Sequence, residues 1–270
     1  MGVVYRVGPN VKNLSMGQRV VAALQIACGE CEFCQRLSSM CDRTNNSSLQ
    51  QLMYITRDAG FYGYSHTTGG FTGGQAEYVH VPRGSVRLLP IADHVLDEQV
   101  LYLSDILPTS YHAVVDTGVG KGETVAIWKF LMLETDVPEP PNKMVLLVRK
   151  MGRHGIIAAC RVCKWNKFGC LDERVPIGNN QAPVHLYWKE ILEEFILAGA
   201  FDPTFVLTHR LPLEDMPAPY KAFDERVPGL EKVIADTKFS EEFGKRGKGC
   251  PPLSRVGDWK TDTAKPQGFN

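Results

Sequence analysis

The 270-residue sequence lacks an excess of charge of either sign. Its 30 basic and 30 acidic residues give a formal net charge of zero at pH 7. Overall charge therefore favours neither a nucleic-acid partner nor an anionic membrane surface. The sequence also has no apolar run that approaches the roughly 20 residues needed for a membrane-spanning helix. We expect neither nucleic acid nor a membrane among its partners.

A secretory leader is a second feature that the sequence lacks. Its first residues, MGVVYRVGPN, do not combine a positively charged stretch with an apolar one, and they are typical of the start of a strand. Apolar residues make up 44% of the chain and charged residues 22%, a normal globular balance for one large domain or two ordinary ones. The sequence therefore predicts a cytoplasmic protein.

Cysteines, in contrast, are concentrated in the stretch ACGECEFCQRLSSMC, which holds four of the eight. Cys28, Cys31 and Cys34 have C-x2-C-x2-C spacing, and Cys41 follows after six further residues. Short C-x2-C turns direct paired sulfurs to one point, where four thiolates at about 2.3 Å can surround zinc tetrahedrally. Such a closed cage has no coordination position for water or substrate, so the spacing predicts a structural zinc rather than a catalytic one.

Three other interpretations of this cysteine cluster stay open. The cysteines could form disulfides, although these are rare in large cytosolic chains. They could form a redox-active C-x2-C pair, which would need no third and fourth cysteine, or a degenerate loop that binds no metal.

The remaining candidate metal ligands carry weaker signals. Cys160, Cys163 and Cys170 have no convincing fourth ligand nearby, and we expect these thiols to pack as small apolar side chains. The seven histidines do not show the H-x-x-x-H spacing of a zinc enzyme. Each histidine is therefore expected on the surface or in the core rather than at a metal.

Hydrophobic patterning divides the chain into two parts. In the first part, strands are predicted by segments such as GVVYRV, QRVVAAL, AEYVHVP and VRLLP. From Leu96 onward, a helical pattern interrupted by Pro108, the buried strand GETVAIW and the helix WKEILEEFILAG, closed by Gly199, predict a parallel α/β arrangement. The polar residues 239–270, rich in Gly and Pro, are expected to be loosely ordered.

Several motifs in the first part carry a family resemblance. GQRV at residues 17–20 and GGQAEYVHVP resemble a Gly-Asp-Arg-Val turn and a Gly-Gly-x-Ala-Glu-Tyr strand of the zinc-dependent medium-chain alcohol dehydrogenases. CDRTNNSS, DAGFYGYSHTTGG and LSDILPTSYHAVVDTGV are most similar to the formaldehyde-dehydrogenase-like branch. The resemblance implies an amino-terminally truncated GroES-like irregular β domain over residues 1–118, an incomplete Rossmann-type parallel α/β domain over 119–238 and a polar tail over 239–270.

The resemblance also implies an activity. Members transfer hydride between an alcohol and NAD, so we expect a small alcohol or aldehyde as substrate, NAD as cofactor and a homo-oligomer as assembly. After the strand TVAIW, however, the chain continues KFLMLETDVPEPPNK, without the Gly-rich turn that meets a pyrophosphate. Asn179, Gln181 and Val184 match a family stretch that lies near the nicotinamide.

A catalytic zinc is the remaining implication of the resemblance. Family members hold it with an upstream cysteine, the histidine of a Gly-His-Glu motif and, in this branch, an aspartate that Asp105 matches in LSDILPTSY. The cysteine and the histidine are expected before Met1, so Asp105 would either bind metal or serve as a helix or loop carboxylate. We therefore expect an impaired dehydrogenase. The alternatives are a non-catalytic zinc-stabilised protein and a faulty gene model of a complete enzyme.

Overall fold

The computed structural model describes most of the chain. The described residues are 1–35, 41–55, 59–125, 153–155, 175–177, 182–248 and 250–254.

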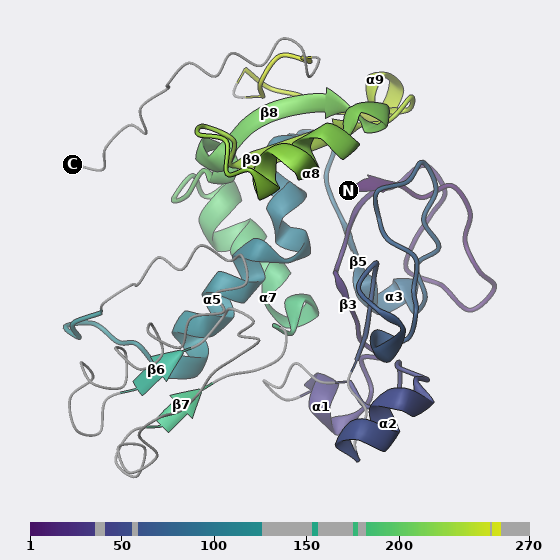
Figure 1. The fold of residues 1–270 in the computed structure, drawn as a ribbon, viewed down its shortest axis with the longest axis vertical. Coiled ribbons are helices and arrows are strands. Elements are labelled where there is room, and N and C mark those ends of the chain that lie inside the picture. Colours follow the sequence, from purple (N-terminus) through teal and green to yellow (C-terminus); the bar gives the residue numbers. More distant parts are fainter. Residues whose placement is uncertain are drawn as a thin grey trace.

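Two small antiparallel sheets form the amino-terminal part (Figure 1). The first is three-stranded in the order β1 (Gly2–Val3), β2 (Arg19–Ala22) and β5 (Leu88–Pro90), and the second pairs β3 (Gln25–Ile26) with β4 (Gly60–Phe61). Val21 is opposite Leu89, and both are buried. The β-branched segment QRVVAAL therefore forms a strand, as predicted, because its apolar side chains pack into the core.

Short helices connect these strands. They are α1 (Glu32–Gln35), α2 (Ser48–Tyr54) and α3 (Gly84–Arg87), with a 3-10 turn at His66–Thr68. The predicted strand AEYVHVP is wrong, because residues 76–82 form no strand. Tyr78 is 57% exposed, and its ring lies 5.3 Å from those of Tyr5 and Phe239. Its aromatic side chain thus packs against two exposed or half-buried rings instead of pairing in a sheet.

The helical pattern that follows Leu96 is divided into three pieces. These are α4 (Asp97–Val100), a 3-10 turn (Leu101–Ser104) and α5 (Ile106–Thr117). Pro108 occupies the first turn of α5, where a backbone N–H has no intrahelical acceptor, so the proline is tolerated.

Among its described residues, the carboxyl-terminal part contains two parallel strand pairs. β6 (Arg153–Gly155) pairs with β7 (Val175–Ile177), and β8 (Leu207–Pro212) pairs with β9 (Lys232–Asp236). The helix α8 (Pro217–Asp224) connects β8 to β9. Short 3-10 turns at Pro203–Val206 and Leu213–Asp215 flank β8, and α9 (Ser240–Phe243) follows β9. The parallel pairs confirm the predicted α/β class.

The predicted helix WKEILEEFILAG is confirmed. It is formed by α7 (Val184–Glu190) and a π-helical continuation, Ile191–Leu197, and Gly199 ends it with a φ of +70°. In Figure 1, α7 and α5 lie side by side, with the β6–β7 pair at the end of α5 away from β8 and β9.

One apolar core spans both parts of the chain. Side chains from β2 and β5, from residues 91–103 and from the continuous helix that begins with α7 contribute to it. Its buried members are Val21, Ala23, Leu89, Ile91, Val95, Val100, Leu103, Val184, Tyr187, Trp188, Ile191, Leu192 and Ile196. Described residues on both sides of the boundary expected at residue 118 therefore share this core.

The beginning of the expected tail is fastened by a buried ionic network. Arg246 forms ion pairs with Asp97 and Asp236 at 3.4 and 2.7 Å, and the N–H of Gly247 donates to Glu98 at 2.5 Å. Arg19 completes the network with an ion pair of 2.5 Å to Asp97. The expectation of a loosely ordered tail is therefore wrong at residues 245–247. Residues 255–270 lie outside the described ranges.

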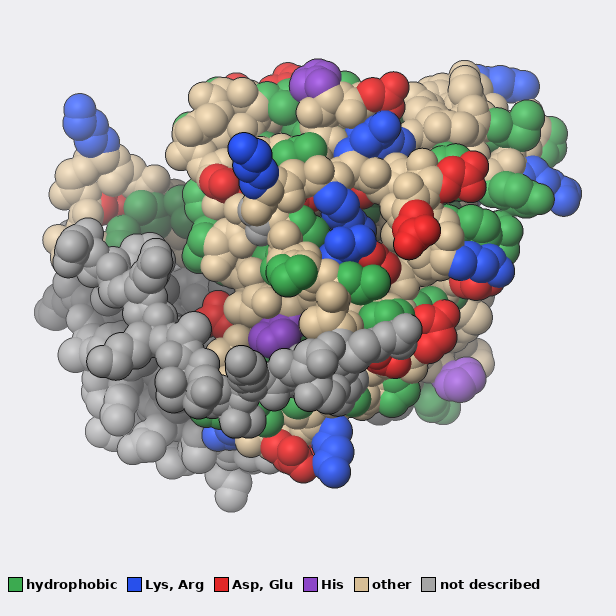
Figure 2. All heavy atoms as spheres, turned by 90° about the horizontal axis from the view of Figure 1, so that it is seen from above, with side chains coloured by type: hydrophobic (Ala, Val, Ile, Leu, Met, Phe, Trp, Pro, Cys, Tyr) green, Lys and Arg blue, Asp and Glu red, His purple; other side chains and the backbone are tan. Residues whose placement is uncertain are grey.

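Surface chemistry agrees with the balanced composition. Figure 2 shows acidic and basic side chains interspersed on the face seen from above, rather than segregated into one large field. Among the described residues, no helix is both long enough and apolar enough to cross a membrane.

Candidate metal centre

The four clustered cysteines converge in the structure. Each is at least 97% buried, and their sulfur atoms all lie within 4.8 Å of one another. The Sγ atoms of Cys28 and Cys34 are 3.8 Å apart, and those of Cys31 and Cys41 are 4.0 Å apart. A regular tetrahedron with zinc–sulfur bonds of about 2.3 Å has edges of about 3.8 Å, so this set of sulfurs fits the ion.

A tight turn makes this convergence possible. Gly29 has a φ of +78°, and a Cβ atom placed on it would lie 2.8 Å from a methyl group of Val86. Only glycine satisfies both restrictions without strain. The turn also directs the backbone N–H groups of Glu30 and Cys31 to Sγ of Cys28, at 3.4 and 3.3 Å. These two hydrogen bonds hold the Cys28 sulfur against the turn.

The acidities of the thiols fit a cation site. Hydrogen bonding to Cys34 lowers the pKa of Cys41 to about 4, and the same interaction raises the pKa of Cys34. Burial raises the pKa of Cys31. One thiolate thus forms readily, whereas further negative charge in the buried cluster is opposed. A divalent cation would remove that opposition, because it stabilises each thiolate.

The apolar support of the cluster is small. Ala27, Ala59 and Phe61 are its only other buried apolar members among the described residues. A polar brace holds the loop as well: the Thr44 hydroxyl donates to the carbonyl of Ile26 at 2.5 Å and accepts from the N–H of Gly60 at 3.1 Å. This bond pattern ties the cysteine loop to both strands of the β3–β4 pair.

A histidine that the sequence did not assign to the site contacts the cysteine loop. The Nε2 atom of His185, in α7, lies 3.1 Å from the carbonyl oxygen of Cys34, a residue 151 positions earlier. Burial lowers the pKa of His185, and the neutral ring with hydrogen on Nε2 can donate this bond. No spacing rule could have identified His185, because the contact depends on how α7 packs against the loop.

Asp105 is placed at the start of a helix rather than in the cysteine centre. It is the residue before α5, and its Oδ1 accepts a hydrogen bond of 2.8 Å from the Thr109 hydroxyl. Within the described ranges, the four cysteines form the only group of three or more potential ligands close enough to hold a metal. The structure thus does not bring Asp105 together with further ligands in those ranges.

The residues matched to a nicotinamide site are only partly described. Asn179 and Gln181 lie outside the described residues, as do Cys160, Cys163 and Cys170. Val184 is the first residue of α7, is fully buried and belongs to the main core. Its side chain is therefore engaged in packing, and its place near a nicotinamide stays a prediction.

Comparisons with known proteins agree with this geometry. Residues 1–92 match the alcohol dehydrogenase GroES-like domain. A zinc-type alcohol dehydrogenase-like protein of Schizosaccharomyces pombe is 41% identical, and the alignment covers 87% of this chain and 76% of that protein. A glutathione-independent formaldehyde dehydrogenase of Pseudomonas aeruginosa is 38% identical over 47% of this chain, but only 30% of its own length is covered.

A solved structure supports the fold. An alcohol dehydrogenase from Thermus sp. ATN1 superposes with a TM-score of 0.67 at 20% identity, covering 88% of this chain and 82% of that one. At this identity the likeness concerns the fold alone.

Proposed function

Because the chain belongs to the zinc-type alcohol dehydrogenase family, with alcohol or aldehyde oxidation as the family's activity, we propose that its cysteine loop holds a structural zinc and that its turnover is impaired. The convergence of four buried sulfurs within 4.8 Å of one another carries the first half of this proposal. Four thiolates complete the coordination of zinc and leave no position for an alcohol, so this centre stabilises the fold.

The second half of the proposal rests on the chemistry that alcohol oxidation requires. A catalytic zinc supplies a Lewis acid that lowers the pKa of a bound alcohol, and it needs an open position beside three protein ligands. Asp105 is the one proposed ligand of such a site in this chain, and its carboxylate is hydrogen-bonded to Thr109. Among the described residues no further ligand joins Asp105, and a lone carboxylate does not hold zinc, so we expect weak alcohol activation.

We further propose that NAD is the family cofactor but binds this chain weakly. The parallel strand pairs and α8 support a partial Rossmann-type region, whereas the segment KFLMLETDVPEPPNK contains no glycine for a phosphate-binding turn. The packing of Val184 in the core argues in the same direction. A small alcohol or aldehyde as substrate, a homo-oligomeric assembly, and a cytoplasmic location stay predictions.

One assay of the purified 270-residue chain tests both halves. We expect about one tightly bound zinc per chain, and NADH formation from a primary alcohol far below the about 1–1000 per second typical of enzymes. Turnover in that range would refute the impairment, and zinc-free protein that keeps its fold would refute the structural zinc.

A non-catalytic, zinc-stabilised protein is the second candidate function. The same closed centre favours it, because its zinc contributes folding free energy whether or not hydride transfer occurs. The two functions differ in cofactor binding: NAD at saturating concentration should raise the melting temperature of a working dehydrogenase and leave that of a purely structural protein unchanged.

The third interpretation, a faulty gene model, is tested on the transcript. An in-frame Gly-His-Glu motif encoded upstream of Met1, together with a Gly-rich turn encoded after Trp128, would restore the complete enzyme. A transcript that reads KFLMLETDVPEPPNK at that place and encodes no Gly-His-Glu motif in frame upstream of Met1 would exclude this interpretation.

A further inference from the structure

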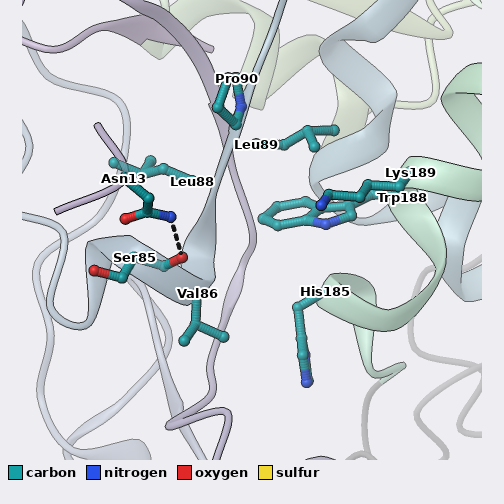
Figure 3. A pocket seen from close by; sticks show the side chains of 9 residues that line it. All are labelled: Asn13, Ser85, Val86, Leu88, Leu89, Pro90, His185, Trp188 and Lys189. Atoms are coloured by element: carbon teal, nitrogen blue, oxygen red, sulfur yellow. Dashed lines mark hydrogen bonds between the residues drawn. The ribbon is translucent and has the colours of Figure 1, made fainter. Parts of the chain in front are cut away.

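A cavity separate from the four sulfur atoms lies between α7 and the α3–β5 segment. Its volume is about 360 Å³, near the lower end of small-molecule sites. Figure 3 shows that α7 contributes His185, Trp188 and Lys189 to the lining of this cavity, and that α3 and β5 contribute further lining residues. These three α7 residues share one helix face, because side chains three and four positions apart are neighbours.

The wall of the cavity is apolar, and the main core holds two of its side chains in place. Trp188 and Leu89 line it while being only 3% and 4% exposed, since both also belong to the main core. Val86 adds a branched side chain from α3. A flat indole beside branched aliphatic groups suits an aromatic or branched alkyl ligand, which gains from both apolar burial and ring contact.

The polar groups of the cavity favour an anion. None of the nine described residues that line it is acidic, and Lys189 supplies an ammonium group that has no ion pair within the described part of the chain. The Asn13 amide lies at the same cavity, where its Nδ2 donates to the carbonyl of Ser85 at 2.8 Å. The lining therefore combines one cation, neutral hydrogen-bonding groups and an apolar wall.

We propose that this cavity binds a small monocarboxylate with an aromatic or branched alkyl group, its carboxylate at Lys189 and its apolar end against Trp188 and Leu89. A charged amine is disfavoured, because it would face Lys189 without a counterion. Asp105 is not among the described residues that line this cavity.

The probe for this site is 4-fluorophenylacetate, followed by fluorine NMR during titration into the zinc-loaded full chain. We expect saturable binding at one site, with a dissociation constant of about 1 mM or lower. The uncharged amide of the same acid should bind about five- to ten-fold more weakly, because it forms no charge-assisted bond with the lysine. Absence of saturation, or equal binding of acid and amide by the unmodified protein, would overturn the proposal.

Variants locate the site. Lys189→Gln should weaken the acid about five- to ten-fold and leave the amide unchanged. The control Lys221→Gln removes an exposed lysine charge from α8, at a residue that is not in the described cavity lining, and should change neither. Zinc content and near-ultraviolet circular dichroism confirm that each variant is folded. Equal loss in the two lysine variants would assign the binding to general surface charge.

Discussion

Two buried clusters among the described residues differ in how far apart their members lie along the chain. The first surrounds the four cysteines and adds only Ala27, Ala59 and Phe61, all contributed by residues 27–61. The second, the main core, brings apolar side chains from residues 21–103 together with those from 184–196. Local chain spacing assembles the first cluster, whereas long-range packing assembles the second.

This difference determines what can stabilise each cluster. Burying one Phe contributes about 1.5–3 kcal/mol, while ordering each backbone residue costs about 1–2 kcal/mol. The cysteine loop therefore cannot be held by its few apolar contacts. Structural zinc contributes about 10–16 kcal/mol in small zinc domains, several times the contribution of one buried Phe. The main core has many large buried side chains and does not need the ion.

Removal of zinc should have the largest effect on the difference between the two clusters. Cys34→Ser, or chelation of the unmodified protein, should abolish zinc binding and unfold residues 27–61, because three thiolates hold the ion less tightly and the loop has little other support. Zinc analysis and hydrogen exchange of the two clusters measure this effect.

The control for this experiment is Cys250→Ser, which changes a half-buried thiol outside the cluster. It should retain zinc and an ordered loop. If Cys34→Ser abolished turnover while zinc, stability and exchange stayed normal, the structural assignment of the centre would be wrong.

Truncation in the main core should produce the next largest effect. Leu103 is fully buried, and Leu103→Ala should lower the free energy of unfolding by about 2–5 kcal/mol through lost burial and a cavity. Zinc content in native buffer should not change. Urea denaturation measures the loss, and Phe205→Ala, at a side chain 63% exposed, is the control with little effect. Loss of zinc from Leu103→Ala under native conditions would mean that the two clusters do not behave separately.

His185 is the contact that joins the two clusters. His185→Ala removes its hydrogen bond to the Cys34 carbonyl, and we expect a cost of about 1 kcal/mol and zinc release several-fold faster. A chromogenic chelator measures the release rate. His94→Ala, at an exposed position remote from the cysteine loop in sequence, is the control. Identical release from both variants would show that the contact does not support the loop.

The smallest expected effect is a pH dependence in the main core. His112 is 6% exposed, its Nδ1 lies 3.0 Å from the Tyr187 hydroxyl, and burial lowers its pKa below 6.5. Below pH of about 6.5 the unfolded chain therefore binds a proton that the folded chain resists, and stability falls as the pH falls. The contribution of His112 to stability is fully present above that pH.

Urea denaturation of zinc-loaded protein between pH 5 and 8 measures this dependence. His112→Gln should make the curve shallower, because one titrating group is lost, although His185 and His209 have pKa values shifted in the same direction by burial and keep part of the slope. An unchanged slope in the variant would exclude His112 as a contributor.

Local sequence signals predicted the elements whose causes are local. The helix closed by Gly199 follows from apolar spacing and a terminal glycine, and the convergence of the cysteine sulfurs follows from short turns. The segment AEYVHVP has strand-like alternation, yet Tyr78 finds its partners in Tyr5 and Phe239. Alternation indicates a capacity to pair, but a strand also requires a partner strand in reach.

Charged residues near the carboxyl terminus illustrate the same limit. Arg246 lies in a polar, glycine-rich stretch that locally predicts disorder, but the buried carboxylates of Asp97 and Asp236 hold it. A charge in such a stretch stays solvated unless the fold brings oppositely charged groups to it. That proximity is a property of the packed chain and cannot be read from neighbouring residues.

The sequence by itself determined the family and the cysteine centre, because both depend on residues that are close along the chain. Only the tertiary structure decided that α7 shares a core with β2 and β5, that His185 contacts the Cys34 carbonyl, and that a cavity opens beside Trp188. The physical reason is that spacing constrains the reach of a short loop, whereas contacts between distant segments are selected by the burial of apolar surface across the whole chain.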